Sequence, residues 1–495
     1  MESRYEAIIG LEIHVQLATK SKMFCSCSNT GENQPMNTTV CPVCMGHPGT
    51  LPVPNGEAIR MAVMAAMALH CRIPERSKFD RKSYFYPDLP KGYQISQFDE
   101  PIGVDGHLTV QLGEHIHRVG ITRLHLEEDA AKLVHISGKE QSIVDFNRSG
   151  SPLAEIVTEP DMRFPEEAGA FLRELRLIVR YLGVSDGDME KGHLRCDANI
   201  SLRPKNEATL FPKTEIKNLN SFRAVERALA YEIQRQTELW DAKTPESAQS
   251  TRGWDDTKSV TVLQRTKEDA ADYRYFPEPD IPPLEFANSY LRFIEAETPE
   301  LPAARRVRFA DEYGLTPKDT NVLVNDKQLG DFAENVVSEL AERAKEEGRD
   351  WEKGKAPLIT QAANWLINRL SKLLFDGGST IEKMPLTAEN FAEFITMTNA
   401  GRLNNQAALT LLSAMVKTGG DPSTLIEEHG LSAIDDEDHL AALVDGVLAD
   451  HGKVVEEYKA GKQAAFQFLV GQVMGASQGK ANPQVVQKIL RDKLS

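Results

Sequence analysis

Residues 10–16 read GLEIHVQ, and after the glycine apolar and polar side chains alternate. Successive side chains of a β-strand point to opposite faces, so Glu12, His14 and Gln16 would share one face. The aliphatic side chains between them would share the other. A solvated strand usually shows Lys, Thr and Glu to water, whereas this polar face carries ligand types for metal ions. The stretch therefore predicts a strand between a hydrophobic core and a polar site.

Two further stretches repeat this pattern, TRLHLEED at residues 122–129 and LRCDANISLR at residues 194–203. In the first, Arg123, His125 and Glu127 alternate with leucines. In the second, an Asp, an Asn, a Ser and an Arg alternate with Cys, Ala, Ile and Leu. Carboxylates, imidazoles and waters together suit Mg2+ or Mn2+. Three such strands predict that one face of a sheet forms a site for a hard cation.

Length and composition limit the kind of protein. A chain of 495 residues is expected to form two to four domains. Its 41% hydrophobic and 26% charged residues are ordinary for a globular protein. No secretory signal is visible at the start, and the longest apolar stretch, near residues 61–69, has about half the length needed to span a bilayer. These features predict a cytoplasmic protein without a membrane partner.

The order of strand-like and helical segments indicates the fold class. Up to about residue 283 they do not alternate regularly, which favours an α+β arrangement with a largely antiparallel sheet over a doubly wound sheet. A stiff, proline-rich boundary is expected at residues 276–283, and beyond Pro299 the pattern is almost wholly helical. The sequence Gly-Gly-Asp-Pro at residues 419–422 predicts a second boundary. The predicted domains are residues 1–294, 295–420 and 421–495.

The formal net charge of −16 argues against extensive nucleic-acid contact, and DNA is not expected as a partner. The charge is unevenly distributed, however. Residues 421–452 carry nine acidic and no basic side chains, whereas residues 453–495 carry seven basic and three acidic ones. The positive segment could contact tRNA, or it could be an ordinary pair of helices with mixed charge.

Four of the six cysteines are clustered, as Cys25, Cys27, Cys41 and Cys44. In a cytosolic chain such cysteines indicate free thiols or a metal rather than disulfides. Two pairs with one or two residues between members, separated by a short loop, match a tetrahedral zinc site. Four thiolates leave no open position for water, so the predicted zinc is structural. Four unligated thiols are the alternative, but the polar loop at residues 28–39 lacks a core of its own and favours the metal.

Nucleotide binding would have to use an unusual surface. No GxxxxGK[ST] loop occurs, so ATP could bind only to a sheet lined with carboxylates. Residues 77–94 interleave cations with aromatic side chains, which suits phosphates and stacked bases. A strand and loop whose cations cover apolar surface would look the same. Taken alone, the segment favours this plainer interpretation.

Several stretches together carry a resemblance to a known family. They are IGLEIH (9–14), KFDRK (78–82), YQISQ (93–97), TRLHLEED (122–129), LRCDAN (194–199), KNLNS (217–221), DYRYFPEPD (272–280) and FLVGQVM (468–474). In these stretches the chain resembles the B subunits of the tRNA-dependent amidotransferases, from about residue 6 to residue 494. The resemblance implies an N-terminal cradle related in fold to glutamine synthetase, an all-helical domain and a small helical tail domain.

The resemblance also implies a reaction. ATP would phosphorylate the side-chain carboxylate of glutamate mischarged on the glutamine tRNA, or of aspartate mischarged on the asparagine tRNA. Ammonia would then displace phosphate and form the amide. ATP is needed because oxide is a poor leaving group, and Mg2+ would neutralise charge on the transferring phosphoryl group. The implied partners are a glutaminase A subunit that supplies ammonia and a small C subunit, in a heterotrimer, together with misacylated tRNA.

Roles for single residues follow from the same resemblance. Candidates for binding metal and ATP phosphates are Glu12, His14, Glu127, Glu128 and Asp197, of which Glu12, His14, Glu127 and Asp197 are the expected magnesium ligands. Alternation favours Glu127 over Glu128, although a β-bulge would reverse this. Further expected phosphate contacts are Arg81, Lys82, Arg123 and Lys217, with Tyr84 and Tyr86 at the acyl-tRNA end. Expected tRNA contacts in the tail are Lys453, Lys459, Lys462, Lys480, Lys488 and Arg491.

Two other functions fit parts of the sequence. A non-catalytic, tRNA-binding scaffold would use the carboxylates as a structural ion network. A free-standing ATP-dependent carboxylate–amine ligase would act on a small acid, although such a substrate needs no helical tail. Hydrolysis of Mg-ATP separates the three functions, because it would be absent in the scaffold, independent of tRNA in the free ligase and dependent on tRNA in the amidotransferase.

Overall fold

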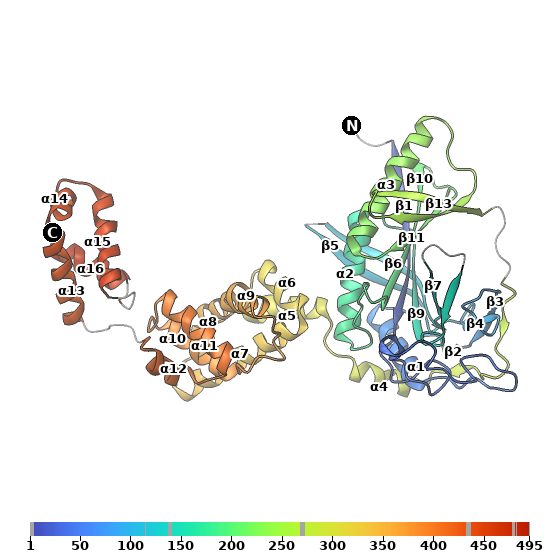
Figure 1. Ribbon diagram of the computed structural model, residues 1–495, viewed down its shortest axis with the longest axis horizontal. Coiled ribbons are helices and arrows are strands. Elements are labelled where there is room, and N and C mark those ends of the chain that lie inside the picture. Colours follow the sequence, from blue (N-terminus) through green and yellow to red (C-terminus); the bar gives the residue numbers. More distant parts are fainter. Residues whose placement is uncertain are drawn as a thin grey trace. The chain divides into compact units, whose positions relative to one another are not determined.

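The computed structural model describes residues 4–113, 115–136, 141–267, 273–431, 437–477, 481 and 483–494. The chain divides into two compact units, Met1–Leu301 and Pro302–Ser495. Every strand of the described residues belongs to the first unit, and the second unit is helical (Figure 1). The α+β class predicted from the sequence is therefore confirmed.

An eight-stranded sheet forms the centre of the first unit, in the order β13-β12-β11-β10-β1-β9-β6-β5. Its strands are β1 (Tyr5–Gln16), β5 (Gly103–Leu112), β6 (His115–Glu128), β9 (Pro152–Thr158), β10 (Leu194–Pro204), β11 (Thr214–Leu219), β12 (Gln249–Asp255) and β13 (Val260–Lys267). Neighbouring strands are antiparallel except β11 and β12, which are parallel. The sheet is thus mixed but largely antiparallel, as the irregular order of elements predicts.

Helices cover one face of this sheet and enclose the main hydrophobic core. α1 (Gly56–Ala68) and α2 (Pro165–Tyr181) contact β5, and α3 (Phe222–Asp241) contacts β10. The aliphatic side chains of β1 point into this core, where Ile13 is fully buried. The alternation of the sequence therefore assigns the core face correctly, and the polar residues of β1 lie on the opposite face.

Three smaller sheets complete the first unit. They are β14 (Phe276–Pro277) with β3 (Asp80–Ser83) and β4 (Tyr93–Ser96), β15 (Leu284–Glu285) with β2 (Arg76–Ser77), and β7 (Lys132–His135) with β8 (Ser142–Asp145). The proline-rich segment expected to be a boundary contributes β14. The following α4 (Asn288–Glu297) buries Ile294 in the main core. This segment lies inside the first unit because its backbone pairs with β3.

The second unit consists of helices. They are α5 (Pro302–Tyr313), α6 (Pro317–Asn325), α7 (Lys327–Glu346), α8 (Trp351–Trp365), the π-helix η2 (Leu366–Leu370), α9 (Ser371–Asp376), α10 (Ala388–Asn399), α11 (Asn405–Thr418), α12 (Pro422–His429), α13 (Glu437–Asp450), α14 (Gly452–Lys459), α15 (Gln463–Ala476) and α16 (Pro483–Leu494). The last four share a small core that includes Leu440, Leu469 and Leu490. Among the described helices, none combines the length and the apolar character needed to cross a membrane.

Candidate active site and metal centre

The strand register builds a row of ionisable side chains across the polar face of the sheet. Arg195 of β10 lies opposite His14 of β1, His14 lies opposite Glu155 of β9, and Glu155 lies opposite His125 of β6. Residues directly opposite one another in neighbouring strands point to the same face and are close enough to interact. The row therefore collects side chains from four strands that are far apart in the sequence.

Two carboxylates and two imidazoles form the centre of the site. His14 Nε2 lies 3.4 Å from Glu127 Oε1 and 3.5 Å from Glu155 Oε2. His125 Nε2 lies 3.3 Å from Glu155 Oε2 and 3.9 Å from Glu127 Oε2. The four side chains are largely buried, with His14 the most exposed at 19%. Each imidazole therefore presents its Nε2 to both carboxylates.

Burial and neighbouring charges shift the pKa values of the side chains in and beside this centre, and at His14 and Glu155 the two effects oppose each other. Burial raises the pKa of Glu12, and the charge of Glu155 raises it further. Burial would also raise the pKa of Glu155, but His125 and His14 outweigh it and hold this pKa well below its usual value. Burial would lower the pKa of His14, but hydrogen bonds to Glu127 and Glu155 raise it to about 10. The buried carboxylates thus stabilise a positive charge between them, as a bound cation would require.

Two overlapping groups of side chains have ligand atoms within 4.8 Å of one another and could hold a metal ion. They are Glu12, His14 and Glu155, and His125, Glu127 and Glu155. Arg123 Nε donates to His125 Nδ1 at 3.3 Å, which places the proton of a neutral His125 on Nε2, facing the carboxylates. His125 then acts as a donor, so the geometry favours His14 as the nitrogen ligand.

Asp197 extends the site along β10. It lies opposite Glu12 in the register of β1 and β10. Lys217 Nζ of β11 lies 2.8 Å from Asp197 Oδ2 and 3.3 Å from Glu215 Oε1. Burial would lower the pKa of Lys217, but Asp197 and Glu215 raise it. The ion pair therefore fixes the Asp197 carboxylate beside Glu12.

Lys82 of β3 approaches the same centre from the small sheet. Its Nζ lies 5.1 Å from the centroid of the Tyr273 ring and 6.0 Å from that of Tyr84. Burial would lower the pKa of Lys82, but nearby Glu127, Tyr275 and Glu155 raise it. The ammonium is thus held by aromatic faces and attracted by the carboxylates of the centre. Burial also raises the pKa of Tyr84 to about 12.

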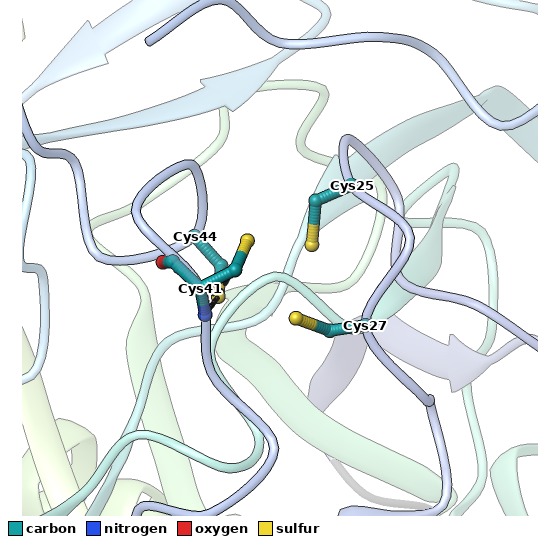
Figure 2. Close-up of side chains that lie close together, drawn as sticks. All are labelled: Cys25, Cys27, Cys41 and Cys44. Atoms are coloured by element: carbon teal, nitrogen blue, oxygen red, sulfur yellow. Dashed lines mark hydrogen bonds between the residues drawn. The ribbon is translucent and has the colours of Figure 1, made fainter.

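The four clustered cysteines converge in the loop that follows β1 (Figure 2). Their sulfur atoms lie within 4.8 Å of one another, and Cys44 Sγ is 3.9 Å from Cys41 Sγ. A tetrahedral zinc–thiolate site has Zn–S distances of about 2.3 Å and therefore sulfurs about 3.8 Å apart. The arrangement fits such a site, so this cluster could hold a metal ion.

A buried lysine indicates that this cluster carries negative charge. The Lys22 side chain is fully buried, and its Nζ lies 3.8 Å from Cys44 Sγ and 3.4 Å from the Phe146 carbonyl oxygen. A buried ammonium needs a negative partner, which four neutral thiols would not supply. A hydrogen bond from Cys25 and the charge of Lys22 lower the pKa of Cys44 to about 5, against the effect of burial. Thiolates, the form that binds metal, therefore suit this site.

Comparison with known proteins identifies the family of the chain. Residues 7–292 match the model of the GatB/GatE catalytic domain, and residues 352–494 match that of the GatB domain. Three curated proteins, each named as the B subunit of aspartyl/glutamyl-tRNA(Asn/Gln) amidotransferase, are similar over 99% of both chains: 46% identical over 494 residues in Carboxydothermus hydrogenoformans, 49% over 492 in Thermomicrobium roseum and 48% over 493 in Roseiflexus castenholzii. The chain belongs to the GatB family. The cysteine cluster and the two groups of the sheet that could hold a metal ion all lie within the GatB/GatE catalytic-domain match.

One predicted carboxylate of this GatB-family chain points away from the site. Glu128 Oε1 accepts a hydrogen bond from Ile95 N at 2.9 Å and pairs with Lys91 Nζ. Both side chains line a separate cavity of about 90 Å3 beside Cys44. The register of β6 and β9 is regular from Arg123 to Glu128, so the alternation that favours Glu127 holds and no bulge reverses it.

Two other predicted residues are also placed outside the centre. Arg81 forms a bidentate ion pair with buried Glu278, with Nε–Oε2 at 2.6 Å and Nη2–Oε1 at 2.8 Å. This pair ties β3 to the proline-rich segment. Tyr86 lies in the loop after β3 and is 59% exposed. The structure thus brings together Glu12, His14, Lys82, Arg123, Glu127, Asp197 and Lys217, and it separates Glu128, Arg81 and Tyr86 from them.

The sequence pattern does not assign Glu155 to the site, and it places His125 on the predicted polar face without identifying it as a ligand. His125 shares the predicted polar face of residues 122–129, so its alternation with Glu127 was the available signal. Glu155 lies in the stretch PLAEIVT at residues 152–158, where one carboxylate interrupts an apolar run. A carboxylate in such a run is unusual unless it is paired, and this was its only local signal.

The described basic residues expected to contact tRNA lie on the last three helices and at their ends. The exposed ones are Lys453, Lys459, Lys462, Lys488 and Arg491, and Lys480 lies outside the described residues. Lys462 Nζ lies 2.8 Å from Glu457 Oε2, with both side chains more than half exposed. A pair this exposed contributes little to stability, so Lys462 can exchange its partner for another anion.

Proposed function

We propose that this chain is the amide-forming subunit of an ATP-dependent amidotransferase that acts on Glu-tRNA(Gln), Asp-tRNA(Asn) or both. The observation that supports this most directly is the largely buried centre of His14, His125, Glu127 and Glu155, with Glu12 beside it, on a sheet within the catalytic-domain match. The names of the relatives supply the substrate class. In this proposal the enzyme is a carbon–nitrogen ligase with glutamine as the amido donor.

The reaction consists of two displacements. An oxygen of the side-chain carboxylate attacks the γ-phosphorus of ATP, the bond from phosphorus to the β–γ bridging oxygen breaks, and ADP leaves. The nitrogen of ammonia then attacks the carbonyl carbon of the acyl phosphate, the carbon–oxygen bond to phosphate breaks, and one N–H proton passes to the departing phosphate. Catalysis of phosphoryl transfer depends mainly on positioning and on neutralising charge.

The residues of the centre suit these two requirements. Glu12, His14, Glu127, Asp197 and Glu155 would hold Mg2+. Bound there, the ion would neutralise charge on the transferring phosphoryl group. Lys82 and Arg123 flank the carboxylates and would contact phosphate oxygens, and Lys217 holds Asp197 in place. The faces of Tyr84 and Tyr273 would confine the acyl-tRNA end beside Lys82.

The remaining parts of the proposal concern zinc and partners. The cysteine cluster would hold a structural Zn2+ that stabilises the loop after β1, since four sulfurs would leave no ligand position for substrate. Ammonia would come from a glutaminase A subunit in a heterotrimer with a small C subunit. The relatives are named as subunits, which supports an assembly of this kind.

Release of γ-phosphate from ATP tests the proposed function. The chain, assembled with the proposed A and C subunits, would be given ammonium, Mg-ATP and misacylated Glu-tRNA(Gln), with a Glu12→Ala assembly in parallel. We expect release that requires the misacylated tRNA and is lost in the variant. Release without tRNA would indicate a free-standing ligase, and full activity of Glu12→Ala would support a scaffold instead.

The tail helices are expected to contribute tRNA affinity. Reversing charge in a Lys459→Glu, Lys462→Glu variant should weaken tRNA binding about tenfold. The slope of log K against log[salt] should become shallower by about 1–2, because a protein with fewer phosphate contacts releases fewer counterions when it binds. Both side chains are exposed, so the helices should still fold. A filter-binding titration measures the affinity, with ATP binding as the unchanged control. Equal tRNA affinity would remove these lysines from the interface.

A further inference from the structure

Arg195 is a cation of the site whose role is not yet accounted for. It begins the row across the sheet, opposite His14, and its side chain is 35% exposed. Burial would lower the pKa of Arg195, but Asp129, Glu127 and Asp197 raise it. The guanidinium therefore lies under the influence of both Glu127 and Asp197, which belong to opposite sides of the proposed magnesium site.

The orientation of this guanidinium is fixed from behind. Asp129 is 5% exposed, and its Oδ2 accepts from Arg195 Nη2 at 2.8 Å and pairs with Arg148 Nε at 3.4 Å. Arg148 also donates to the carbonyl oxygens of Ala130 and Ala131, both at 3.2 Å. The other oxygen of Asp129 accepts from the Ala130 backbone N–H at 2.9 Å. Asp129 is thus held on both oxygens and can aim Arg195 in one direction.

The same guanidinium has a donor that the described residues do not satisfy. Arg195 Nε is buried and makes no hydrogen bond within the described part of the chain. A buried donor without a partner is costly, by about 1–3 kcal/mol, so native proteins seldom retain one without a purpose. A partly exposed guanidinium with a fixed orientation and an unsatisfied N–H is suited to a tetrahedral oxyanion.

We propose that Arg195 contacts the γ-phosphoryl oxygens of ATP and that Asp129 is its positioning residue. This inference rests on the proposed function, in which Glu127 and Asp197, whose charges act on Arg195, help to hold the metal that binds the same phosphates. The arginine supplies directional hydrogen bonds, whereas the neighbouring Lys217 is already paired with Asp197 and Glu215. The side chain would therefore distinguish ATP from ADP, which lacks the γ-phosphoryl group.

Nucleotide discrimination tests the inference. The full-length chain in its assembly would be titrated calorimetrically with Mg-ATP and with Mg-ADP, as wild type, Arg195→Lys and Asp129→Asn. We expect Arg195→Lys to weaken the binding of ATP about tenfold and that of ADP hardly at all, because a lysine cannot reproduce the forked set of donors of a guanidinium. Asp129→Asn should reduce the ATP-to-ADP preference less strongly but in the same direction. A variant that merely lost structure would lose both nucleotides together.

The matched control is Arg203→Lys on the same strand. Arg203 Nε also pairs with a carboxylate, Glu6 Oε1 at 2.7 Å, but it lies at the opposite end of β10 from Arg195. Its nucleotide affinities should be unchanged. Unchanged ATP affinity in Arg195→Lys, an equal loss for both nucleotides, or a rise confined to the KM for misacylated tRNA would each overturn this inference alone. Absence of ATP binding by the wild type would overturn the proposed function and this inference with it.

Discussion

A Glu155→Gln variant is expected to lose tRNA-dependent phosphate release by about 1,000-fold, equivalent to about 4 kcal/mol of transition-state stabilisation. Among the described residues, Glu155 is the one that belongs to both groups of the sheet that could hold a metal ion, and its carboxylate faces His14 and His125. The amide keeps the size of the side chain but removes its negative charge. Without that charge the centre binds a cation less tightly and both imidazoles lose a partner.

The matched control for this prediction is Glu159→Gln. Glu159 directly follows β9, is exposed, and accepts a hydrogen bond from Thr122 Oγ1 at 2.7 Å. The substitution removes the same kind of charge as Glu155→Gln but at a side chain that does not contact the centre. The Glu159→Gln variant should therefore keep wild-type activity. Single-turnover phosphate release at saturating Mg-ATP measures the chemical step for both variants. A Glu155→Gln enzyme within tenfold of wild type would show that the centre does not hold the catalytic metal.

Local pattern was sufficient to predict β1 and its two faces. Glu12 and His14 face the site because Ile13 and its apolar neighbours belong to the core, and this follows from alternation alone. The same argument separates Glu127 from Glu128 once β6 is regular. Residues whose direction is set by their own strand could therefore be assigned from the sequence.

Residues whose role depends on distant partners could not be assigned from the sequence. Glu155 becomes the centre of the site only because β9 pairs with β1 on one side and β6 on the other, and its own sequence does not reveal that register. Arg81 is a residue type that often binds phosphate, but its guanidinium forms an ion pair with Glu278, which is far along the chain. The proline-rich segment has the composition of a linker, yet part of it pairs with β3 in a sheet. Long-range pairing decides each of these cases.

Loss of one cysteine ligand is expected to destabilise the first unit strongly. The wild-type chain should bind about one equivalent of zinc. The Cys44→Ser variant should lose most of it, since a three-sulfur site binds the ion much less tightly. Lys22, fully buried beside Cys44, would also lose its negative partner, and an uncompensated buried charge costs about 3–5 kcal/mol. At about 2 °C or more per kcal/mol, the Tm should fall by on the order of 10 °C.

A Cys71→Ala variant separates the role of zinc from that of a buried thiol. Cys71 is buried beside Gly103 and Gly106 and lies outside the cysteine cluster, so its loss should leave the zinc content unchanged. Elemental analysis and thermal unfolding measure the two quantities on the same samples. The cluster would stabilise a loop, whereas the carboxylates proposed to bind Mg-ATP lie on the sheet. Folded Cys44→Ser protein at low temperature should therefore still bind Mg-ATP. A Cys44→Ser protein with wild-type Tm and zinc content would refute a structural zinc site at these cysteines.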